Sequence, residues 1–400
     1  MVFSIKGRKY TRRPPLKVMM LGFRGFPGVQ GGIEKHAENL CPLLVRHGIS
    51  VNAIVRKPYV SEVPLPVWKG VHRLPVWAPQ SAHFEALLHS FLGVLVAALR
   101  RPDVLHIHGI GPALVTPLAR LFGLTVIVTH HGPDYDREKW GLLARCMLRA
   151  GELTAVLASH RVIAVSRTVE KLISERYGKT CDFIPNGIHL PDIPATTDRL
   201  AAFDLERRRY VLTVGRLVPE KRQLDLIEAF ARARLGRWKL VIVGDIDHAN
   251  PYADRLAKIA AETPNVVLTG FQTGETLREL YAHAGLFVLP SSHEGLPIAL
   301  LEAMSFGLPV LVSDIPAHLE IALSPNNYFR VADVESLAGA LKRRAVRPVE
   351  EEELRLQRFR VAQRFNWDNI ASKTIAVYHK LADPFRGGVV KEAKEANLEH

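Results

Sequence analysis

Residues 16–34 read LKVMMLGFRGFPGVQGGIE, and this stretch carries the signal that decides the fold. Its first six residues are a short apolar run of the kind that forms a buried strand. A glycine-rich loop follows, and a helical pattern then continues over residues 33–44. Glycine lets the backbone approach a ligand closely, and the N–H groups at a helix start point toward anions. The order of strand, loop and helix therefore predicts an α/β unit, although the glycine spacing matches neither a dinucleotide fingerprint nor a P-loop.

The same alternation of apolar runs and helical patterns extends along the whole chain. It predicts β-α-β units around buried parallel sheets. The further apolar runs lie at 51–55, 104–107, 125–129, 162–165, 183–184, 210–214, 239–243, 266–268, 286–289 and 309–312. Between residues 185 and 209, prolines and turn-forming residues interrupt the pattern. We therefore predict an α/β fold of two Rossmann-like, doubly wound domains that face a central cleft, with ligands beyond the carboxyl ends of the strands.

The composition is that of a globular protein. Of the 400 residues, 48% are hydrophobic and 23% are charged, which excludes a disordered or fibrous chain. Three cysteines lie far apart without a C-x-x-C pair, so neither a disulfide framework nor a zinc ribbon is expected. No apolar run is long enough to span a bilayer, and the basic start lacks the apolar core of a signal peptide. We expect a cytoplasmic protein.

The excess of positive charge lies almost entirely in the first half. Residues 1–198 contain 25 Lys and Arg against 14 Asp and Glu, whereas the remainder contains 28 against 26. Such an asymmetry is typical of a polyanionic partner, although a solvated basic surface gives the same pattern. The sequence contains no zinc-finger spacing, no aromatic RNA-binding strand and no heptad-linked basic region, so we expect no nucleic acid partner. An anionic membrane surface or a phosphorylated substrate remains.

Two basic residues follow the first apolar run of the second half. Arg216 comes shortly after this run, and Lys221 stands where a helix is expected to begin. Cations at a helix start oppose the helix dipole unless an anion lies between them. This position at the carboxyl end of a strand favours a diphosphate site, with two solvated charges as the alternative.

Residues 291–303 read SSHEGLPIALLEA and carry the most specific signal. Glu294 and Glu302 are eight positions apart, and Pro297 favours a helix start between them. Glu294 then lies in a loop, and Glu302 lies one to two turns inside the helix. Carboxylate oxygens accept hydrogen bonds from the hydroxyl groups of sugars and ribose. For either residue alone, a capping carboxylate or an exposed helical glutamate is the simpler interpretation.

Taken together, these motifs resemble the retaining glycosyltransferases of the GT-B type, in the glycogen-synthase-like family four. The resemblance extends from about residue 16 to residue 380 and rests on four ordered motifs. They are Gly-Gly-Ile-Glu at 31–34, Ile-Pro-Asn-Gly at 184–187, Gly215-Arg216 with Lys221, and the pair of Glu294 and Glu302. It implies an acceptor domain over 16–190, a linker over 191–208, a nucleotide-sugar domain over 209–365 and a helix over 366–385 that crosses back to the first domain. We further expect a basic tail over 1–15 and a tail over 386–400 that ends in an expression-tag remnant.

The resemblance also implies roles for individual residues. The two cations bind the donor diphosphate with help from glycine amides of the other domain, and Glu302 accepts the ribose hydroxyls. Glu294 holds the transferred sugar, and Phe271 lies at the base pocket. The donor-binding set is Gly31, Gly32, Arg216, Lys221, Phe271, Glu294, Gly295, Leu296 and Glu302, and the catalytic set is His131, Glu294, Arg216 and Lys221.

Histidines at two strand ends form a further candidate group. His106 and His108 lie two residues apart on one face of a predicted strand, and His131 follows the next strand. His-x-His is also a metal-ligand spacing, so a zinc site is an alternative, although the sequence shows no third ligand. By the resemblance, His131 lies near the transferred sugar. His108, Asp134 and Arg137 are candidates for binding the acceptor.

One further motif points toward a metal. Asp245 and Asp247 spell the Asp-x-Asp pattern that binds a metal in another glycosyltransferase fold. Here the pair follows an apolar run of the second half, where family four often has a turn, so we interpret it as loop chemistry. We expect no required metal and no cofactor.

The sequence as a whole predicts a retaining, metal-independent hexosyltransferase that moves a hexose or deoxyhexose from a nucleotide-diphosphate sugar to a glycan acceptor. The segment that begins at His131 resembles members that build bacterial surface polysaccharides on lipid carriers. This implies a polyprenyl-diphosphate-linked acceptor and a peripheral position on the inner leaflet of the cytoplasmic membrane, with binding that weakens as salt rises. The apolar helix expected over 83–101 is either a core helix or a helix in that interface. A GT-B-type sugar-nucleotide epimerase or phosphorylase, and a non-catalytic sugar-nucleotide-binding protein, are the alternatives.

Overall fold

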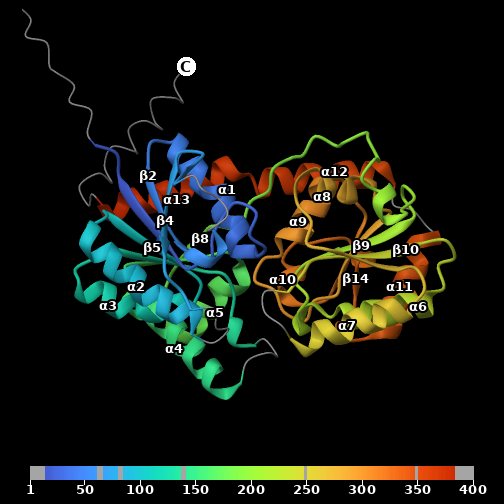
Figure 1. Cartoon of the computed structure of the whole chain (residues 1–400), viewed down its shortest axis with the longest axis horizontal. Coiled ribbons are helices and arrows are strands. Elements are labelled where there is room, and N and C mark those ends of the chain that lie inside the picture. The colour runs from blue at the N-terminus through green and yellow to red at the C-terminus, as the bar shows by residue number, and fades with distance from the viewer. Residues whose placement is uncertain are drawn as a thin grey trace, which may run out of the picture.

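The computed structural model describes residues 14–60, 66–79, 84–136, 141–246, 250–346 and 350–382. Figure 1 shows two α/β domains side by side, each built around one sheet. The expected tails over 1–15 and 386–400 lie outside the described residues, apart from residues 14 and 15. Within the described part of the chain, no helix combines the length and apolar character needed to cross a lipid bilayer.

The sheet of the first domain has the described strand order β3-β4-β2-β1-β5-β6-β7-β8. Neighbouring strands are parallel, except that β3 pairs antiparallel with β4. Each apolar run predicted in this half corresponds to a strand, whereas β3 and β4 were not predicted. The strands are β1 (Lys17–Leu21), β2 (Ser50–Arg56), β3 (Val67–Trp68), β4 (Val71–Val76), β5 (Val104–His108), β6 (Val126–His130), β7 (Arg161–Ala164) and β8 (Asp182–Phe183).

Helices cover both faces of this sheet. One face packs against α1, whose residues Leu40 and Leu44 join Val18 and Val55 in the core. The other face packs against α2, α3 and α4, and α5 lies beside β7 and β8. The helices are α1 (Gly32–Arg46), α2 (Glu85–Arg100), α3 (Thr116–Leu121), α4 (Leu142–Ala158) and α5 (Arg167–Tyr177).

The second domain repeats this plan with the strand order β11-β10-β9-β12-β13-β14, all parallel among the described strands. Helices α6, α7 and α11 pack on one face, and α8, α9 and α12 pack on the other. The strands are β9 (Tyr210–Val214), β10 (Lys239–Val243), β11 (Val266–Gly270), β12 (Leu286–Leu289), β13 (Val310–Ser313) and β14 (Tyr328–Phe329). The helices are α6 (Gln223–Ala233), α7 (Pro251–Glu262), α8 (Gly274–His283), α9 (Ile298–Ser305), α10 (Pro316–Leu319), α11 (Val334–Val346) and α12 (Glu351–Arg364).

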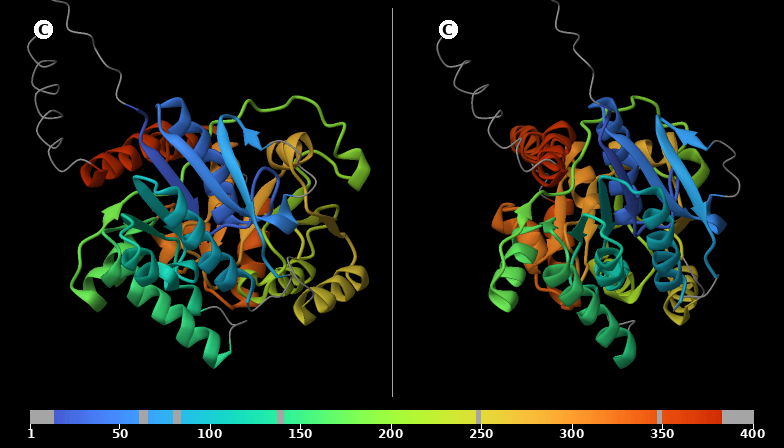
Figure 2. Two further views of the ribbon diagram at one scale, coloured as in Figure 1. Left: turned by 60° about the vertical axis from the view of Figure 1, so that its left-hand side comes forward. Right: turned by 90° about the vertical axis from the view of Figure 1, so that its left-hand side faces the viewer.

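The chain passes between the domains twice, and the two passages lie together. The amide of Ile188 donates to the Phe365 carbonyl at 2.8 Å, and Ile188 forms an isolated β-bridge with Asn366. The last described helix, α13 (Trp367–Ala382), then runs beside α1 of the first domain (Figure 2). Its Tyr378 is fully buried in the core of that domain. The end of the described chain thus completes the domain in which the chain begins.

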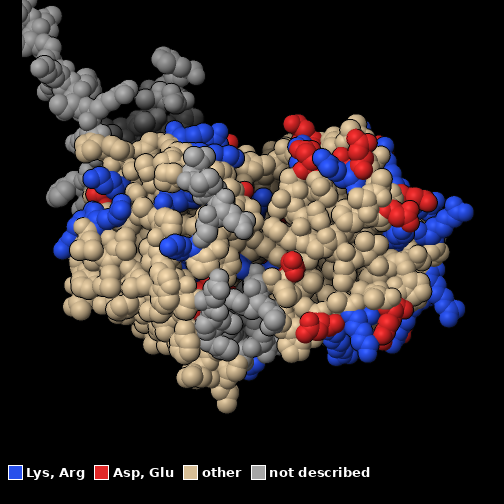
Figure 3. Space-filling view, in the orientation of Figure 1, with Lys and Arg blue, Asp and Glu red and all other residues tan. Residues whose placement is uncertain are grey.

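The charge asymmetry of the sequence appears on the molecular surface. Figure 3 shows cations and carboxylates mixed over the second domain, whereas few carboxylates are visible over the first. Much of the lower surface of the first domain, over α2, α3 and α4, shows neither kind of charge in this view.

Candidate functional site

A lysine and a glutamate meet at the carboxyl ends of the strands of the second sheet. Lys221 ends a short 3₁₀ turn after β9, and Glu294 lies in the loop between β12 and α9. The Lys221 Nζ atom lies 2.5 Å from Glu294 Oε1, and the Ser291 hydroxyl donates to the same oxygen at 2.7 Å. Gly215 lies directly beside the lysine, and a Cβ atom there would be in van der Waals contact with Lys221 Cε at 3.4 Å. The structure therefore brings together one predicted cation and one predicted carboxylate that are far apart in the sequence.

Glu294 is held in its ionised form. Burial alone would raise the pKa of its carboxyl group, but the Lys221 ammonium and the Ser291 hydroxyl lower that pKa to about 2. The two side chains are only 18% and 11% exposed, so water screens the pair weakly. The pair is a fixed ammonium and a carboxylate that is a weak base.

Glu302 is the fifth residue of α9, as the predicted helix start at Pro297 implies. The Tyr281 hydroxyl donates to Glu302 Oε2 at 3.1 Å. Burial raises the pKa of Glu302, and Lys35 of the first domain is the largest opposing charge. Glu302 is therefore close enough to the first domain for the charge of Lys35 to act on it, and ribose binding by its carboxylate stays a prediction.

The two domains meet at a pair of glycines. A Cβ atom on Gly295 would lie 1.8 Å from the His131 carbonyl oxygen, and a Cβ atom on Gly132 would lie 3.1 Å from the Gly295 Cα atom. Backbone therefore packs directly on backbone at this point, and any side chain at Gly295 would push the domains apart. The segment after β6 is thereby fixed beside the loop that carries Glu294.

Asn186, in the Ile-Pro-Asn-Gly motif, connects the domains a second time. Its side-chain amide donates to the Leu296 carbonyl at 3.0 Å, and its Oδ1 atom lies 2.9 Å from the Nδ1 atom of His36. Because Oδ1 is an acceptor, His36 carries its proton on Nδ1. The sequence predicts the Ile-Pro-Asn-Gly motif as a family feature, but it does not predict that Asn186 bridges the two domains.

Three histidines lie close together near this contact: His36 of α1, His108 of β5 and His131, which follows β6. The Nδ1 atom of His108 lies 3.2 Å from Nε2 of His131, and the ring centroids of His36 and His131 are 5.1 Å apart. One ligand atom from each of the three lies within 4.8 Å of the others, so the group is able to hold a metal ion. Burial lowers the pKa of His36 to about 4 and lowers the pKa of His108 and His131 well below the ordinary value. The cluster is therefore uncharged at neutral pH.

His106 lies beside His108 on one face of β5, as predicted, with ring centroids 4.2 Å apart, but both of its ring nitrogens have partners outside the three-histidine cluster. Its Nδ1 atom lies 2.7 Å from the Tyr378 hydroxyl and its Nε2 atom lies 2.6 Å from the Thr129 hydroxyl. His106 thus ties α13 to the first sheet. His36, the third member of the cluster, was missed because nothing local to its helix indicates that it meets two strand ends.

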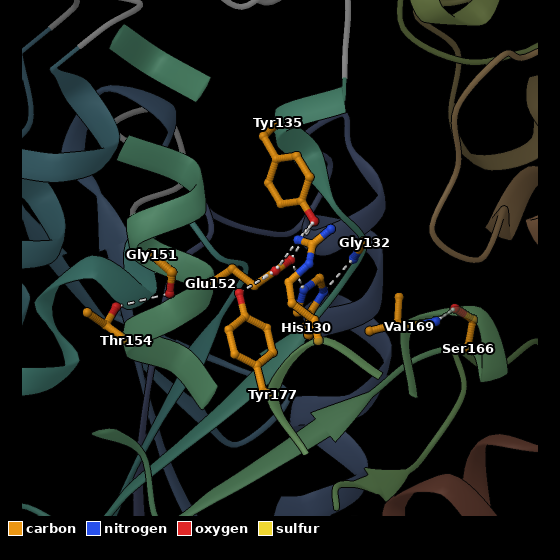
Figure 4. Close-up of polar contacts among 10 residues, drawn as sticks. His130, Gly132, Tyr135, Gly151, Glu152, Thr154, Ser166, Val169 and Tyr177 are labelled. Carbon is orange, nitrogen blue, oxygen red and sulfur yellow. Dashed lines mark hydrogen bonds and ion pairs between the residues drawn. The ribbon is translucent and has the colours of Figure 1, made fainter. Parts of the chain in front are cut away.

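A buried carboxylate, Glu152 of α4, holds the segment that carries His131. Figure 4 shows His130, Tyr135 and Tyr177 directed at it. Its Oε2 atom lies 3.1 Å from His130 Nε2 and accepts from the Tyr135 hydroxyl at 2.9 Å. Its Oε1 atom accepts from the Tyr177 hydroxyl at 2.7 Å and from Arg176 at 2.8 Å. Although burial opposes ionisation, these donors lower the pKa of Glu152 to about 2.

The glycine-rich loop of the first domain has its own internal support. Glu34 accepts hydrogen bonds from the backbone amide and the side chain of Arg24, both at 3.1 Å. Gly31 precedes α1 with a φ of 146°, and a Cβ atom there would lie 2.0 Å from Glu34 Oε2. Gly32 is the first residue of the helix and has open space beside it. The geometry leaves the helix start accessible, and phosphate binding by these two amides stays a prediction.

The remaining predicted residues lie at the same strand ends or outside the described chain. Arg216 is half-buried just after β9, and Phe271 is 39% exposed just after β11. Asp134 is half-buried in the segment after His131, whereas Arg137 lies outside the described residues. Asp245 Oδ1 accepts from the backbone amide of Ile246, and Asp247 also lies outside the described residues.

The two Rossmann-like domains meet at the carboxyl ends of their strands, with a cation and two carboxylates near the junction. This arrangement defines a glycosyltransferase of the GT-B class. Comparison with family models agrees. A model described as "Glycosyltransferase Family 4" matches residues 30–191, and one described as "Glycosyl transferases group 1" matches residues 198–355. The chain belongs to family four of the glycosyltransferases.

The chain is similar in sequence to other glycosyltransferases and in fold to solved structures. An uncharacterized glycosyltransferase of Methanocaldococcus jannaschii is 27% identical, over 93% of this chain and 100% of the relative. The GDP-mannose:cellobiosyl-diphosphopolyprenol alpha-mannosyltransferase of Xanthomonas campestris is 26% identical, over 71% of this chain and 76% of the relative. Sucrose-phosphate synthase of Thermosynechococcus elongatus superposes with a TM-score of 0.77 at 22% identity, over 92% and 99% of the two chains. HepE of Anabaena, solved with UDP and glucose, gives a TM-score of 0.73 at 17% identity, over 90% and 99%.

Proposed function

We propose that this glycosyltransferase is a retaining, metal-independent hexosyltransferase. It takes a hexose or deoxyhexose from a nucleotide-diphosphate sugar and passes it to a polyprenyl-diphosphate-linked glycan. The observation that carries the proposal is the contact between Lys221 and Glu294 beside the junction of the two domains. We place the protein in the cytoplasm, at the anionic inner surface of the cytoplasmic membrane.

The cations of the second domain supply the electrostatic part of catalysis. Breaking the bond between sugar and phosphate builds negative charge on the leaving diphosphate and positive charge on the anomeric carbon. A fixed ammonium near the diphosphate stabilises that transition state more than the ground state. Lys221 is held in place by Glu294 before the donor arrives, so little reorganisation is needed. Arg216, which follows strand β9 just before Lys221, adds a second cation.

The protonation states favour retention without a carboxylate nucleophile. With a pKa of about 2, Glu294 is a weak base at neutral pH, and its role is to accept hydrogen bonds from the sugar hydroxyls. Neutral His131 offers a hydrogen bond rather than a charge. The departing phosphate oxygen is then the base that takes the proton of the acceptor hydroxyl. Attack from the face on which the phosphate leaves keeps the configuration of the anomeric carbon.

We assign no metal to this chemistry. In other sites a divalent cation neutralises a leaving diphosphate, and here Arg216 and Lys221 provide that charge. The cluster of His36, His108 and His131 offers three neutral nitrogen ligands, which suit zinc better than a phosphate-bound magnesium ion. We therefore treat it as a hydrogen-bonded part of the domain junction.

Two comparisons support the choice of ligands. The name of the Xanthomonas relative specifies a nucleotide-diphosphate donor and an acceptor on a polyprenol diphosphate. HepE of Anabaena was also solved with UDP-glucose. The basic first half of this chain is suited to an acceptor that is itself a lipid diphosphate.

The test is a donor panel with a matched pair of lysine variants. Thermal shifts with UDP-, GDP- and deoxythymidine-diphosphate sugars identify the donor, because selective binding raises stability. Product analysis then separates transfer from epimerisation and phosphorolysis. Lys221→Met should reduce transfer by about a thousandfold, the range expected for a group that stabilises the transition-state charge.

Lys239→Met is the matched control for that variant. Lys239 also forms an ion pair, at 2.6 Å with Asp204, and its side chain is similarly buried, but it lies away from the site. It should leave transfer unchanged. Full activity of Lys221→Met, or an equal loss in both variants, would contradict the assigned role.

A further inference from the structure

We propose that Glu320 of the second domain is a positioning residue for transfer, because it fixes the placement of the two domains by capping α5 of the first. Figure 1 shows α5 and α10 on the facing sides of the two domains. Glu320 directly follows α10, and its carboxylate lies at the amino-terminal end of α5. The inference goes beyond the proposed function, since it concerns the alignment of the two halves of the site, whichever sugar and acceptor are used.

The carboxylate of Glu320 acts as a helix cap that comes from another domain. Its Oε1 atom accepts from the backbone amide of Arg167 at 2.8 Å. Its Oε2 atom accepts from the backbone amide of Thr168 at 3.2 Å and from the hydroxyl of the same residue at 3.3 Å. Inside the helix, the Ser166 hydroxyl accepts from the Val169 amide at 3.2 Å (Figure 4). Two amides of the first turn of α5 are thus satisfied by the second domain, through the charge that the helix dipole favours at this end. We call this contact the interdomain cap.

The interdomain cap is shielded from water and lies beside a passage of the chain between the domains. The Glu320 side chain is only 9% exposed, so water screens the contact weakly. Arg364, the last residue of α12, donates to the Glu320 carbonyl oxygen at 3.1 Å. The next residue, Phe365, pairs through its carbonyl with Ile188 of the other passage. Glu320 therefore joins the first domain to the point where the chain crosses over.

A short path of hydrogen bonds connects the interdomain cap to the donor half of the site. His318 of α10 is fully buried, and its Nδ1 atom donates to the Ser313 carbonyl oxygen at 2.9 Å. The Ser313 hydroxyl donates to the Ser291 carbonyl at 2.5 Å, and the Ser291 hydroxyl bonds Glu294. The element that carries Glu320 is thus anchored to the loop that carries Glu294.

Helix α5 connects the interdomain cap to the other half of the site. The helix has 11 residues, and it ends with Arg176 and Tyr177, which both donate to Glu152. Glu152 in turn holds the segment that carries His131. Glu320 therefore acts on one end of a helix whose other end supports this segment. The interdomain cap sets the position of the His131 segment relative to the Glu294 loop.

Loss of the interdomain cap should affect the rate of transfer more than the binding of the donor. Glu320→Gln keeps the size of the side chain but removes its charge and turns an NH2 group toward amide donors. Misplacing reacting groups by about 1 Å costs about a hundredfold in rate. We expect kcat to fall between about tenfold and a hundredfold. Donor affinity should stay within about twofold of wild type, because Lys221 and Glu294 both belong to the second domain.

The experiment compares Glu320→Gln with Glu170→Gln in the full chain. Glu170 is a matched control, because it pairs with Arg167 at 2.6 Å on the same end of α5 but within the first domain. Transfer is measured from UDP-glucose and GDP-mannose to a polyprenyl-diphosphate-linked glycan, and binding of both donors is measured by calorimetry. Hydrogen exchange at the first turn of α5 should be at least about tenfold faster in Glu320→Gln and unchanged in the control. Small-angle scattering should show a larger radius of gyration in Glu320→Gln alone.

Glu320→Asp retains the charge on a shorter side chain, so it should lose less of kcat than Glu320→Gln. An unchanged kcat in Glu320→Gln, or an equal loss in Glu170→Gln, overturns the proposal. So does a loss of donor affinity as large as the loss of kcat, because the damage then lies within the second domain. If Glu320→Gln does not fold, full kcat in Glu320→Asp with fast exchange at α5 overturns it.

A wild type that transfers from neither donor contradicts the proposed function, and scattering then decides on the interdomain cap. An unchanged radius of gyration in Glu320→Gln would overturn it.

Discussion

Replacing Glu152 by glutamine tests how the first domain holds the segment after β6. The carboxylate is fully buried and receives hydrogen bonds from four side chains. In the glutamine variant the side-chain NH2 group faces donors that previously bonded a carboxylate oxygen, so hydrogen bonds are lost in a buried site. The network lowers the pKa of Glu152 from 4.5 to about 2. That change corresponds to about 3 kcal/mol of folding stability, because each tenfold change in ionisation is worth about 1.4 kcal/mol. Removing one partner of a buried ion pair lowers the free energy of unfolding by a similar amount, about 3–5 kcal/mol.

The assay is urea unfolding of wild type and Glu152→Gln from neutral pH down to about pH 3. Because the folded-state pKa is lowered, the stabilisation is complete above the unfolded pKa of 4.5 and is lost as pH falls toward 2. The difference between the two proteins should therefore be about 3 kcal/mol at neutral pH and should shrink through this acid range. Glu175→Gln is the control, since Glu175 forms an exposed pair with Lys171 at 3.7 Å and should cost at most about 0.5 kcal/mol.

Transfer should also become less efficient in Glu152→Gln, with a raised KM for the acceptor and unchanged donor binding. A neutral-pH loss below about 1 kcal/mol, or a difference that does not vary with pH, would refute the reasoning.

Three further predictions concern the domain junction. Gly295→Ala places a methyl group against the His131 carbonyl and should reduce transfer more than tenfold in a continuous assay. Gly339→Ala in α11 is the control and should leave transfer unchanged. Normal activity of Gly295→Ala would show that the glycine contact is dispensable. Asn186→Ala removes the hydrogen-bond partner of both the Leu296 carbonyl and His36. It should lower the free energy of unfolding, measured in urea, by about 1–3 kcal/mol. A smaller change would count against the bridge. Dialysis against EDTA should leave transfer unchanged, and a stoichiometric metal that is removed together with activity would instead assign the three-histidine cluster to a metal ion.

The repeated pattern of apolar runs was enough to predict most of the fold. Strands buried on both faces of a parallel sheet read as unbroken apolar segments, which is why β1, β5 and β9 were found to within a residue or so. Strand β4 reads VHRLPV, with polar residues and a proline, because it lies next to the edge of its sheet. Strands β3 and β14 have two residues each and were not predicted, whereas β8, equally short, was found because Phe183 and Ile184 stand directly before the Pro-Asn-Gly turn.

The candidate site was predictable only where chemistry is local. Glu294 and Glu302 share one motif, and Lys221 follows a strand, so their neighbourhood could be inferred. Glu152 lies within a helical sequence, where it reads as a solvated glutamate, and its four donors come from three other elements. His36 likewise meets partners more than 70 residues away. Such contacts arise from packing of whole elements, which no short window of sequence records.

The return of α13 to the first domain has a consequence for synthesis. Trp367, Ile370 and Tyr378 occupy the core beside α1, and Tyr378 bonds His106 in the middle of the first sheet. A nascent chain on the ribosome lacks these residues until its final helix has emerged, so the amino-terminal half cannot close its core during translation. Both halves must then mature together after release, and a premature stop before α13 should yield an aggregation-prone fragment in place of an independent acceptor domain.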